Sequence, residues 1–254
     1  MDHVQNFAMG RWLLVLAYLT SVVGCALGLA CAGQACYSGT ERNRWGWLTL
    51  AAVSIGGVGI WVMHFIAMLG FETPGMPVRY DIARTILSAV LSIAAVLLGL
   101  LVVGVRSRFT WWRLLLGGLI TGLAVNLMHY TGMWALQIKG TFGYNGAIVA
   151  LSIVIAIVAA TAALWFAVAL DKPLPRLLAG LVMAGAVTGM HYTGMAAVEM
   201  TMDMAAPDPS GAEVFSFLFP VFVLAALAMA VPLCAVLMAP AAGESKPEDV
   251  PLHY

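Results

Sequence analysis

The chain has 254 residues, of which 62% are hydrophobic and 9% are charged, and its formal net charge is zero. A soluble domain carries about 25% charged residues, so the composition excludes an ordinary soluble protein. The neutral balance gives no indication of a nucleic-acid partner. The charged residues fall in short stretches between apolar runs of about 20 residues, the length that crosses a bilayer as a helix. The sequence therefore predicts an all-α, polytopic membrane protein in contact with lipid.

Seven apolar runs predict seven transmembrane helices. In chain order we place them near residues 12–32, 46–70, 82–105, 113–136, 146–170, 177–199 and 214–238. The first run also resembles a signal peptide, but the region before it is short and carries Asp2 as well as Arg11, a weak positively charged segment. We therefore expect it to be retained. The predicted organisation is one membrane domain over residues 1–240 and a short cytoplasmic tail over 241–254.

The distribution of basic residues predicts the orientation. One set of segments between helices carries seven Lys and Arg residues: Arg42, Arg44, Arg106, Arg108, Arg113, Lys172 and Arg176. The alternate set carries four: Arg11, Arg79, Arg84 and Lys139. Because Lys and Arg accumulate in cytoplasmic loops, we expect the N-terminus outside and the C-terminus in the cytoplasm.

A short motif recurs three times, once in every second predicted helix. Its copies are Met63-His64-Phe65-Ile66-Ala67-Met68, Met128-His129-Tyr130-Thr131-Gly132-Met133 and Met190-His191-Tyr192-Thr193-Gly194-Met195. The histidines are separated by 65 and 62 residues, and each interval is one pair of helices. The chain is therefore predicted to contain three tandem helix-pair repeats, over about 12–70, 82–136 and 146–199, followed by a seventh helix over about 214–238.

The spacing of the motif has a geometric consequence. The three helices that carry it run in the same direction, so the repeats should be parallel and related by an axis along the membrane normal. We expect pseudo-threefold packing, with one histidine from each pair facing the axis. His129 lies roughly 24 Å along its helix at about 1.5 Å per residue, which predicts that the three histidines share a depth in the outer third of the bilayer.

The motif offers metal ligands inside the membrane. Intramembrane ionisable residues are costly, which makes His64, His129 and His191 candidates for a shared site. The methionine four residues later, which is Met68, Met133 or Met195, lies on the same helix face. Imidazole suits copper or zinc, and thioether sulfur suits Cu(I). We therefore predict a copper site, Cu(I) or Cu(II), with zinc as the alternative. The preceding methionines are second-choice ligands or packing residues: Met63, Met128 and Met190.

Residues around the motif suggest supporting roles. Small residues stand seven positions before and three after each histidine, and they favour close helix packing: Gly57, Gly122, Ala184, Ala67, Gly132 and Gly194. Asn126 and Thr188, three residues before a histidine, are candidates to orient the site, and Trp61 breaks this pattern. The acidic, Met-rich segment over residues 199–204 is either an outer copper-capture segment or a frayed helix end.

At these residues the sequence resembles the MHYT domain, a bacterial integral-membrane sensor module named for its Met-His-Tyr-Thr motif. Met128–Thr131 and Met190–Thr193 match in full, whereas Met63–Ile66 matches in part. The resemblance implies a bacterial inner-membrane protein that binds copper through motif residues and senses O2, CO or NO. Family members are often fused to cytoplasmic cyclic-di-GMP domains, and residues 239–254 are too few for one. The resemblance thus implies a stand-alone or truncated form with an unidentified cytoplasmic partner.

Three functions stay open at this point. We favour a non-enzymatic sensory module with copper held near the outer face. Copper transport or delivery is the first alternative, favoured by the Met-rich segment but lacking a ligand chain toward the inner face. A membrane metalloenzyme with a three-histidine site, either a zinc hydrolase or a copper oxidase, is the second. Hydrolysis at such a metal generally needs a nearby carboxylate, and none is evident at the depth of the motif.

Overall fold

The computed structural model describes residues 12–71, 77–104, 110–170, 172–203 and 205–239. Within them, seven helical spans are long and apolar enough to cross a membrane. They are α1 (Trp12–Tyr37), the continuous span α2 (Glu41–Ala52), η1 (Val53–Val62) and α3 (Met63–Met68), then α4 (Ile82–Val103), α5 (Trp111–Ala135), α6 (Gly146–Ala169), α7 (Pro173–Ala196) and α8 (Val214–Met238). The predicted all-α fold with seven spans is confirmed, and its helix ends lie within about five residues of the observed ones.

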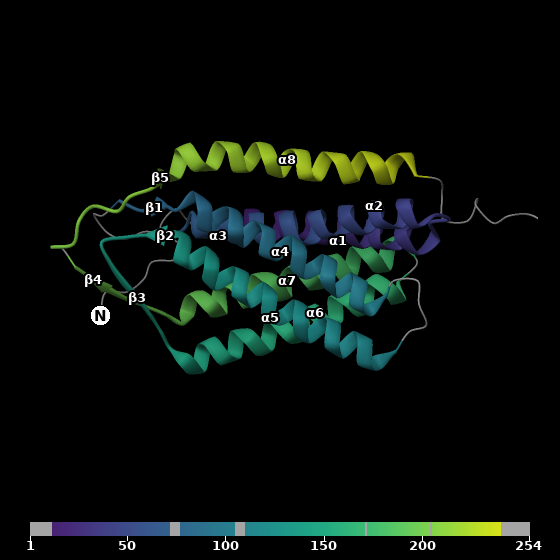
Figure 1. The fold of residues 1–254 in the computed structure, drawn as a ribbon, viewed down its shortest axis with the longest axis horizontal. Coiled ribbons are helices and arrows are strands. Elements are labelled where there is room, and N and C mark those ends of the chain that lie inside the picture. Colours follow the sequence, from purple (N-terminus) through teal and green to yellow (C-terminus); the bar gives the residue numbers. More distant parts are fainter. Residues whose placement is uncertain (1–11, 72–76, 105–109, 171, 204, 240–254) are drawn as a thin grey trace, which may run out of the picture.

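The long helices run side by side as one bundle (Figure 1). Along the chain, α4 packs on α5, α5 on α6 and α6 on α7, and α1 closes the bundle by packing on both α7 and η1. Helix α8 lies along one side of the bundle, where it contacts η1 and α1. The span Glu41–Met68 is 89% buried over its most apolar stretch, against 17–56% for the other six, so it forms the centre of the bundle. The threefold relation between the repeats stays a prediction.

A π-helical segment leads into the first motif. Over η1 the wider helix turns leave backbone carbonyls to be satisfied from outside the segment. Ser21 Oγ of α1 donates to the Gly59 carbonyl at 2.7 Å, and Ser92 Oγ of α4 donates to the Gly56 carbonyl at 2.7 Å. These hydroxyls satisfy backbone groups in a region where lipid offers no hydrogen bonds. They also fix η1, and therefore α3, against both neighbouring helices.

Five short strands lie together at one end of the bundle, beyond the ends of α3, α5 and α7 (Figure 1). Strands β2 (Leu136–Gln137), β1 (Arg79–Tyr80) and β5 (Ala212–Glu213) form one antiparallel sheet in that order, and β3 (Gly140–Tyr144) pairs with β4 (Val198–Met202). No pattern in the sequence predicted these strands. Met200 and Met202 lie in β4, so the segment is neither a frayed helix end nor an isolated loop; Met204 lies outside the described residues.

The lipid-facing surface of the helices is apolar. Large side chains such as Leu98 of α4, Val158 of α6 and Leu227 of α8 are 46%, 64% and 56% exposed. An apolar surface of this kind is stable only in contact with lipid or another apolar partner. Membrane insertion is therefore consistent with both sequence and fold, whereas the orientation stays a prediction. Arg11, Arg106, Arg108 and the predicted tail 241–254 lie outside the described residues.

Candidate metal centre

The three motif histidines meet inside the bundle. His64 comes from α3, His129 from α5 and His191 from α7, and each side chain is at most 1% exposed. The Nδ1 atom of His64 lies 3.0 Å from Nδ1 of His191 and 3.3 Å from Nδ1 of His129. One nitrogen from each ring lies within 4.8 Å of the other two. The prediction that repeats separated by 65 and 62 residues bring the histidines together is confirmed.

The Nδ1 atoms face one another and are suited to a shared cation. A neutral imidazole carries a proton on one nitrogen and a lone pair on the other, so three converging Nδ1 atoms cannot all donate to each other. With all three protons on Nε2, the Nδ1 lone pairs point into one space. Two nitrogens about 2.0–2.1 Å from one ion, the usual zinc–imidazole distance, subtend an angle of about 90–110° when they lie 3.0–3.3 Å apart. The donor set and its spacing therefore fit a metal ion.

The opposite edges of two rings rest on glycines of the next repeat. A Cβ atom at Gly132 of α5 would stand 2.5 Å from His64 Nε2, and one at Gly194 of α7 would stand 2.4 Å from His129 Nε2. These Nε2 atoms are buried and have no hydrogen-bond partner among the described residues. Each glycine thus leaves room for a ring from the preceding repeat, a role that helix packing alone did not predict. The equivalent position of α3 is Ala67, which departs from this pattern.

The aromatic residue after each histidine packs edge-on against its own imidazole. The ring centroids of His64 and Phe65 are 5.0 Å apart, with interplanar angle 86°, and the pairs at His129 and His191 have angles of 80° and 81°. In the second repeat the Tyr130 hydroxyl lies 3.2 Å from Ser152 Oγ of α6. Phe65 is 2% exposed and carries no hydroxyl, so burying its ring leaves no hydroxyl group to be satisfied. The structure therefore explains how the first repeat keeps an aromatic ring without the tyrosine hydroxyl.

Two of the three residues that stand three positions before the histidines donate a hydrogen bond to the following helix and not to an imidazole. Trp61 Nε1 donates to Ser88 Oγ of α4 at 3.0 Å, and Asn126 Nδ2 donates to Ser152 Oγ of α6 at 3.1 Å. The two serines are 64 residues apart, close to the spacing of the motif histidines, so they too belong to the repeat. Thr188 Oγ1 is buried and has no hydrogen-bond partner among the described residues.

The motif methionines are all buried. The six are at most 2% exposed: Met63, Met68, Met128, Met133, Met190 and Met195. Burial suits both a sulfur ligand and an apolar packing residue, so their role as ligands stays a prediction. Met190 also lines a cavity between the helices, which indicates a packing role on the side of the cluster that faces away from the strands.

The histidine cluster contains no charged side chain from the described part of the chain. Among the described residues, no carboxylate or thiolate belongs to the cluster, which consists of three imidazoles. At the strand end of the bundle, Lys139 Nζ lies 2.7 Å from Asp208 Oδ1, and this hydrogen bond lowers the pKa of the Asp208 carboxyl. Within the described residues the cluster offers a bound cation no acidic side chain to balance its charge, which favours an ion of low charge.

Comparison with known proteins identifies the repeat. The family model MHYT, described as a bacterial signalling protein N-terminal repeat, matches residues 57–117 and 122–180. The chain belongs to the MHYT family. The matched segments contain His64 and His129, and the third copy of the motif, at His191, lies beyond them.

The MHYT chain is also similar to longer signalling proteins. It is 36% identical over 195 residues to the bifunctional diguanylate cyclase/cyclic di-GMP phosphodiesterase MucR of Pseudomonas aeruginosa, a match that covers 75% of this chain and 28% of MucR. It is 34% identical over 210 residues to the cyclic di-GMP phosphodiesterase NbdA of the same organism, covering 80% of this chain and 26% of NbdA. The signaling protein YkoW of Bacillus subtilis is 34% identical over 176 residues, or 66% of this chain and 22% of YkoW. The chain spans about a quarter of these relatives, and no solved structure gives a significant match.

Proposed function

We propose that this protein is a non-enzymatic membrane sensory module of a bacterial inner membrane, with copper held by His64, His129 and His191 near the outer face. The observation that carries the proposal is the convergence of three buried Nδ1 atoms, with separations of 3.0 and 3.3 Å at His64. Burying three imidazoles side by side without a hydrogen-bond partner for two of their Nε2 atoms is costly. A cation bound by the three Nδ1 lone pairs would leave the Nε2 atoms as they are, but it would contribute binding free energy that offsets the cost of burying them.

Copper fits the donor set better than other divalent metals. Imidazole sites generally follow an affinity order that peaks at copper, and thioether sulfur selects Cu(I). Met68, Met133 and Met195 lie one turn beyond the histidines on the same helices and are buried at the same end of the bundle. When bound, copper supplies a redox-active centre with an open position for a diatomic ligand. The protein supplies three neutral nitrogens, an apolar surrounding and exclusion of water.

Signalling is supported by the relatives. Their names assign synthesis or breakdown of cyclic di-GMP to MucR and breakdown to NbdA, and this chain matches about a quarter of each. The shared segment is the membrane repeat, so we propose that it supplies the sensing step, with O2, CO or NO as the signal. An unidentified cytoplasmic partner would receive the output. The proposed orientation, with the N-terminus outside, places the strand end of the bundle on the outer side.

Two observations support sensing over the rival functions. A metallohydrolase generally needs a carboxylate acid or base beside the metal, and the described cluster contains imidazoles alone. A copper transporter needs ligands that continue inward, whereas the space inward of Met190 is lined by apolar side chains and Thr121. Moving a charged ion through such a lining is expensive. We therefore propose that the metal stays at the histidines.

Metal analysis of the purified protein tests the proposal. We expect a single copper ion per chain in the wild type, and close to none in His129→Ala and His191→Ala. Thr188→Val is the matched control, because it alters a buried residue one turn before His191 while removing a hydroxyl that has no hydrogen-bond partner among the described residues. Copper lost equally in Thr188→Val would show that the variants act through misfolding. Zinc in place of copper, or copper retained without both histidines, would contradict the proposal.

A further inference from the structure

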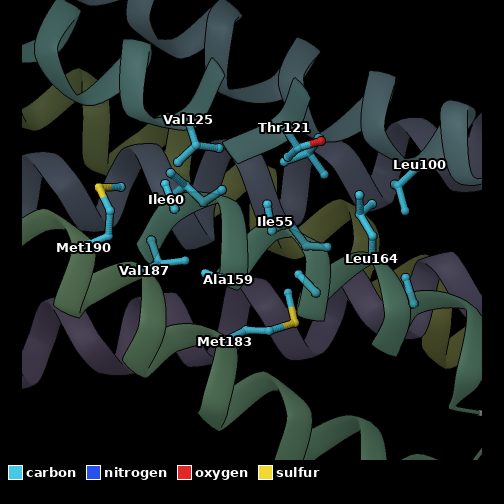
Figure 2. Close-up of a pocket in the computed structure, with 15 residues that line it drawn as sticks. Ile55, Ile60, Leu100, Thr121, Val125, Ala159, Leu164, Met183, Val187 and Met190 are labelled. Carbon is cyan, nitrogen blue, oxygen red and sulfur yellow. The ribbon is translucent and has the colours of Figure 1, made fainter. Parts of the chain in front are cut away.

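An apolar cavity lies between the helices, on the side of the histidine cluster that faces away from the strands. Its volume is about 50 Å³, and it is lined from η1, α4, α5, α6 and α7. Figure 2 shows it as a column that runs from Met190 and Ile60 at one end to Leu100 and Leu164 at the other. Most of the lining residues are buried and three are partly exposed, namely Ala159, Ala163 and Val187, so the cavity lies mainly in the interior of the bundle.

Helix α6 creates this space with alanines. Ala156, Ala160, Ala163 and Ala167 recur at helical spacing and all line the cavity, where leucine or isoleucine would fill it. Well-packed interiors leave few voids larger than a water molecule, because each void forfeits dispersion contacts. A row of small side chains that keeps such a void open therefore lowers the stability of the bundle unless a bound molecule fills the void.

The lining selects an apolar occupant. Thr121 is the polar residue among those that line the cavity, and its hydroxyl already donates to the Ala95 carbonyl at 3.3 Å. A buried water needs two to four polar partners, and genuinely apolar cavities stay dry. Thr121 Oγ1 can still accept a hydrogen bond, but one partner is fewer than a buried water needs, so the lining disfavours a polar or charged molecule.

The size limits the occupant further. A cavity needs roughly 10–15 Å³ to hold one water-sized sphere, so about 50 Å³ accommodates a molecule of only a few heavy atoms. A lipid acyl chain is far too large. We infer that the cavity binds one small apolar molecule of the size of a diatomic gas, independently of any metal. Met190 forms one end of it and His191 is the next residue of α7, so this end of the cavity lies beside the motif of the third repeat.

Xenon is a suitable probe because it is apolar, close in size to a diatomic gas and visible by anomalous scattering. Crystals of the metal-free full chain are pressurised with xenon, and the experiment compares the wild type with Ala160→Leu. Ala160 is 8% exposed and faces the cavity, so the added carbons should fill it. Ala150→Leu is the matched control, because it makes the same change at an exposed position of the same helix.

We expect a xenon peak between Val125, Ala160 and Val187 in the wild type and in Ala150→Leu, and at least a tenfold lower occupancy in Ala160→Leu. If Ala160→Leu fails to fold, Ala160→Val adds less volume and should lower the occupancy partly. No xenon in the wild-type cavity, equal occupancy in the filled variants, or ordered water or lipid there would overturn the inference. Because the crystals contain no metal, failure of the copper proposal leaves this result unaffected.

Discussion

Replacing Gly132 with alanine tests the geometry of the centre most directly. The added Cβ would stand 2.5 Å from His64 Nε2 and 3.2 Å from its Cδ2, whereas ordinary van der Waals contact begins at 3.4 Å. The imidazole or helix α5 must therefore move by about 0.9 Å. His64 is 1% exposed and has Phe65 packed edge-on against it, so the ring has little space in which to move.

The size of this displacement sets the expected effect. Metal–ligand distances vary by only about 0.2 Å in well-formed sites, so a shift of about 0.9 Å removes His64 as a ligand. Changes in groups that merely support a ligand cost about 10–100-fold in metal affinity, and we expect a loss of at least about 100-fold here. Overpacking of the interior should also lower the free energy of unfolding by about 1–3 kcal/mol.

The assay is copper titration of the purified variant, together with its thermal denaturation. Gly189→Ala in α7 is the matched control, because a Cβ there meets nothing within 4 Å. Alanine at an open helix position should leave copper affinity unchanged and keep or raise stability. Gly194→Ala should behave like Gly132→Ala, since its Cβ would stand 2.4 Å from His129 Nε2. Wild-type copper affinity and stability in Gly132→Ala would show that the His64 ring does not lie against α5, and the reasoning would be wrong.

Three further predictions follow from the same contacts. Thr188→Val should keep copper and leave thermal stability unchanged or raised by up to about 1 kcal/mol, because the hydroxyl has no partner among the described residues; a large loss of stability would reveal a partner. Ser152→Ala should cost about 1–3 kcal/mol in denaturation experiments, since it leaves the Asn126 amide without its acceptor; no change would contradict this bond. Copper at about 100 times its Kd should stabilise the wild type by about 2.7 kcal/mol and should leave His191→Ala unchanged; equal stabilisation of both would place copper elsewhere.

The sequence predicted the helices and the histidine cluster well, for a physical reason. Crossing hydrocarbon requires a long apolar run, and that requirement is visible along one dimension of the sequence. The cluster followed from repetition, because parallel helix pairs of nearly equal length return His64, His129 and His191 to one depth. No contact between distant residues had to be known. The spans and the meeting of the three rings were therefore predictable from a single sequence.

The details of the site were less predictable because they depend on contacts between repeats. Gly132 and Gly194 were interpreted as helix-packing residues, and the imidazoles resting on them became visible only in three dimensions. Asn126 was a candidate to orient a histidine, yet its amide binds Ser152 of the next helix. The strands at the end of the bundle join loops that are distant in the sequence, such as Gly140–Tyr144 and Val198–Met202. Short segments of this kind carry no periodic signal.

Each of the two glycine contacts joins a histidine of one repeat to a helix of the following repeat. His64 of the first repeat rests on α5 of the second, and His129 of the second rests on α7 of the third. Drawing the three Nδ1 atoms toward one ion would therefore act on the packing between repeats, not within a single helix pair. At their opposite ends these spans begin at Glu41, Trp111 and Pro173, on the side predicted to be cytoplasmic. Because packed helices move as rigid elements and not by bending, we expect a change at the histidines to reach that face as a change in the relative position of three helices.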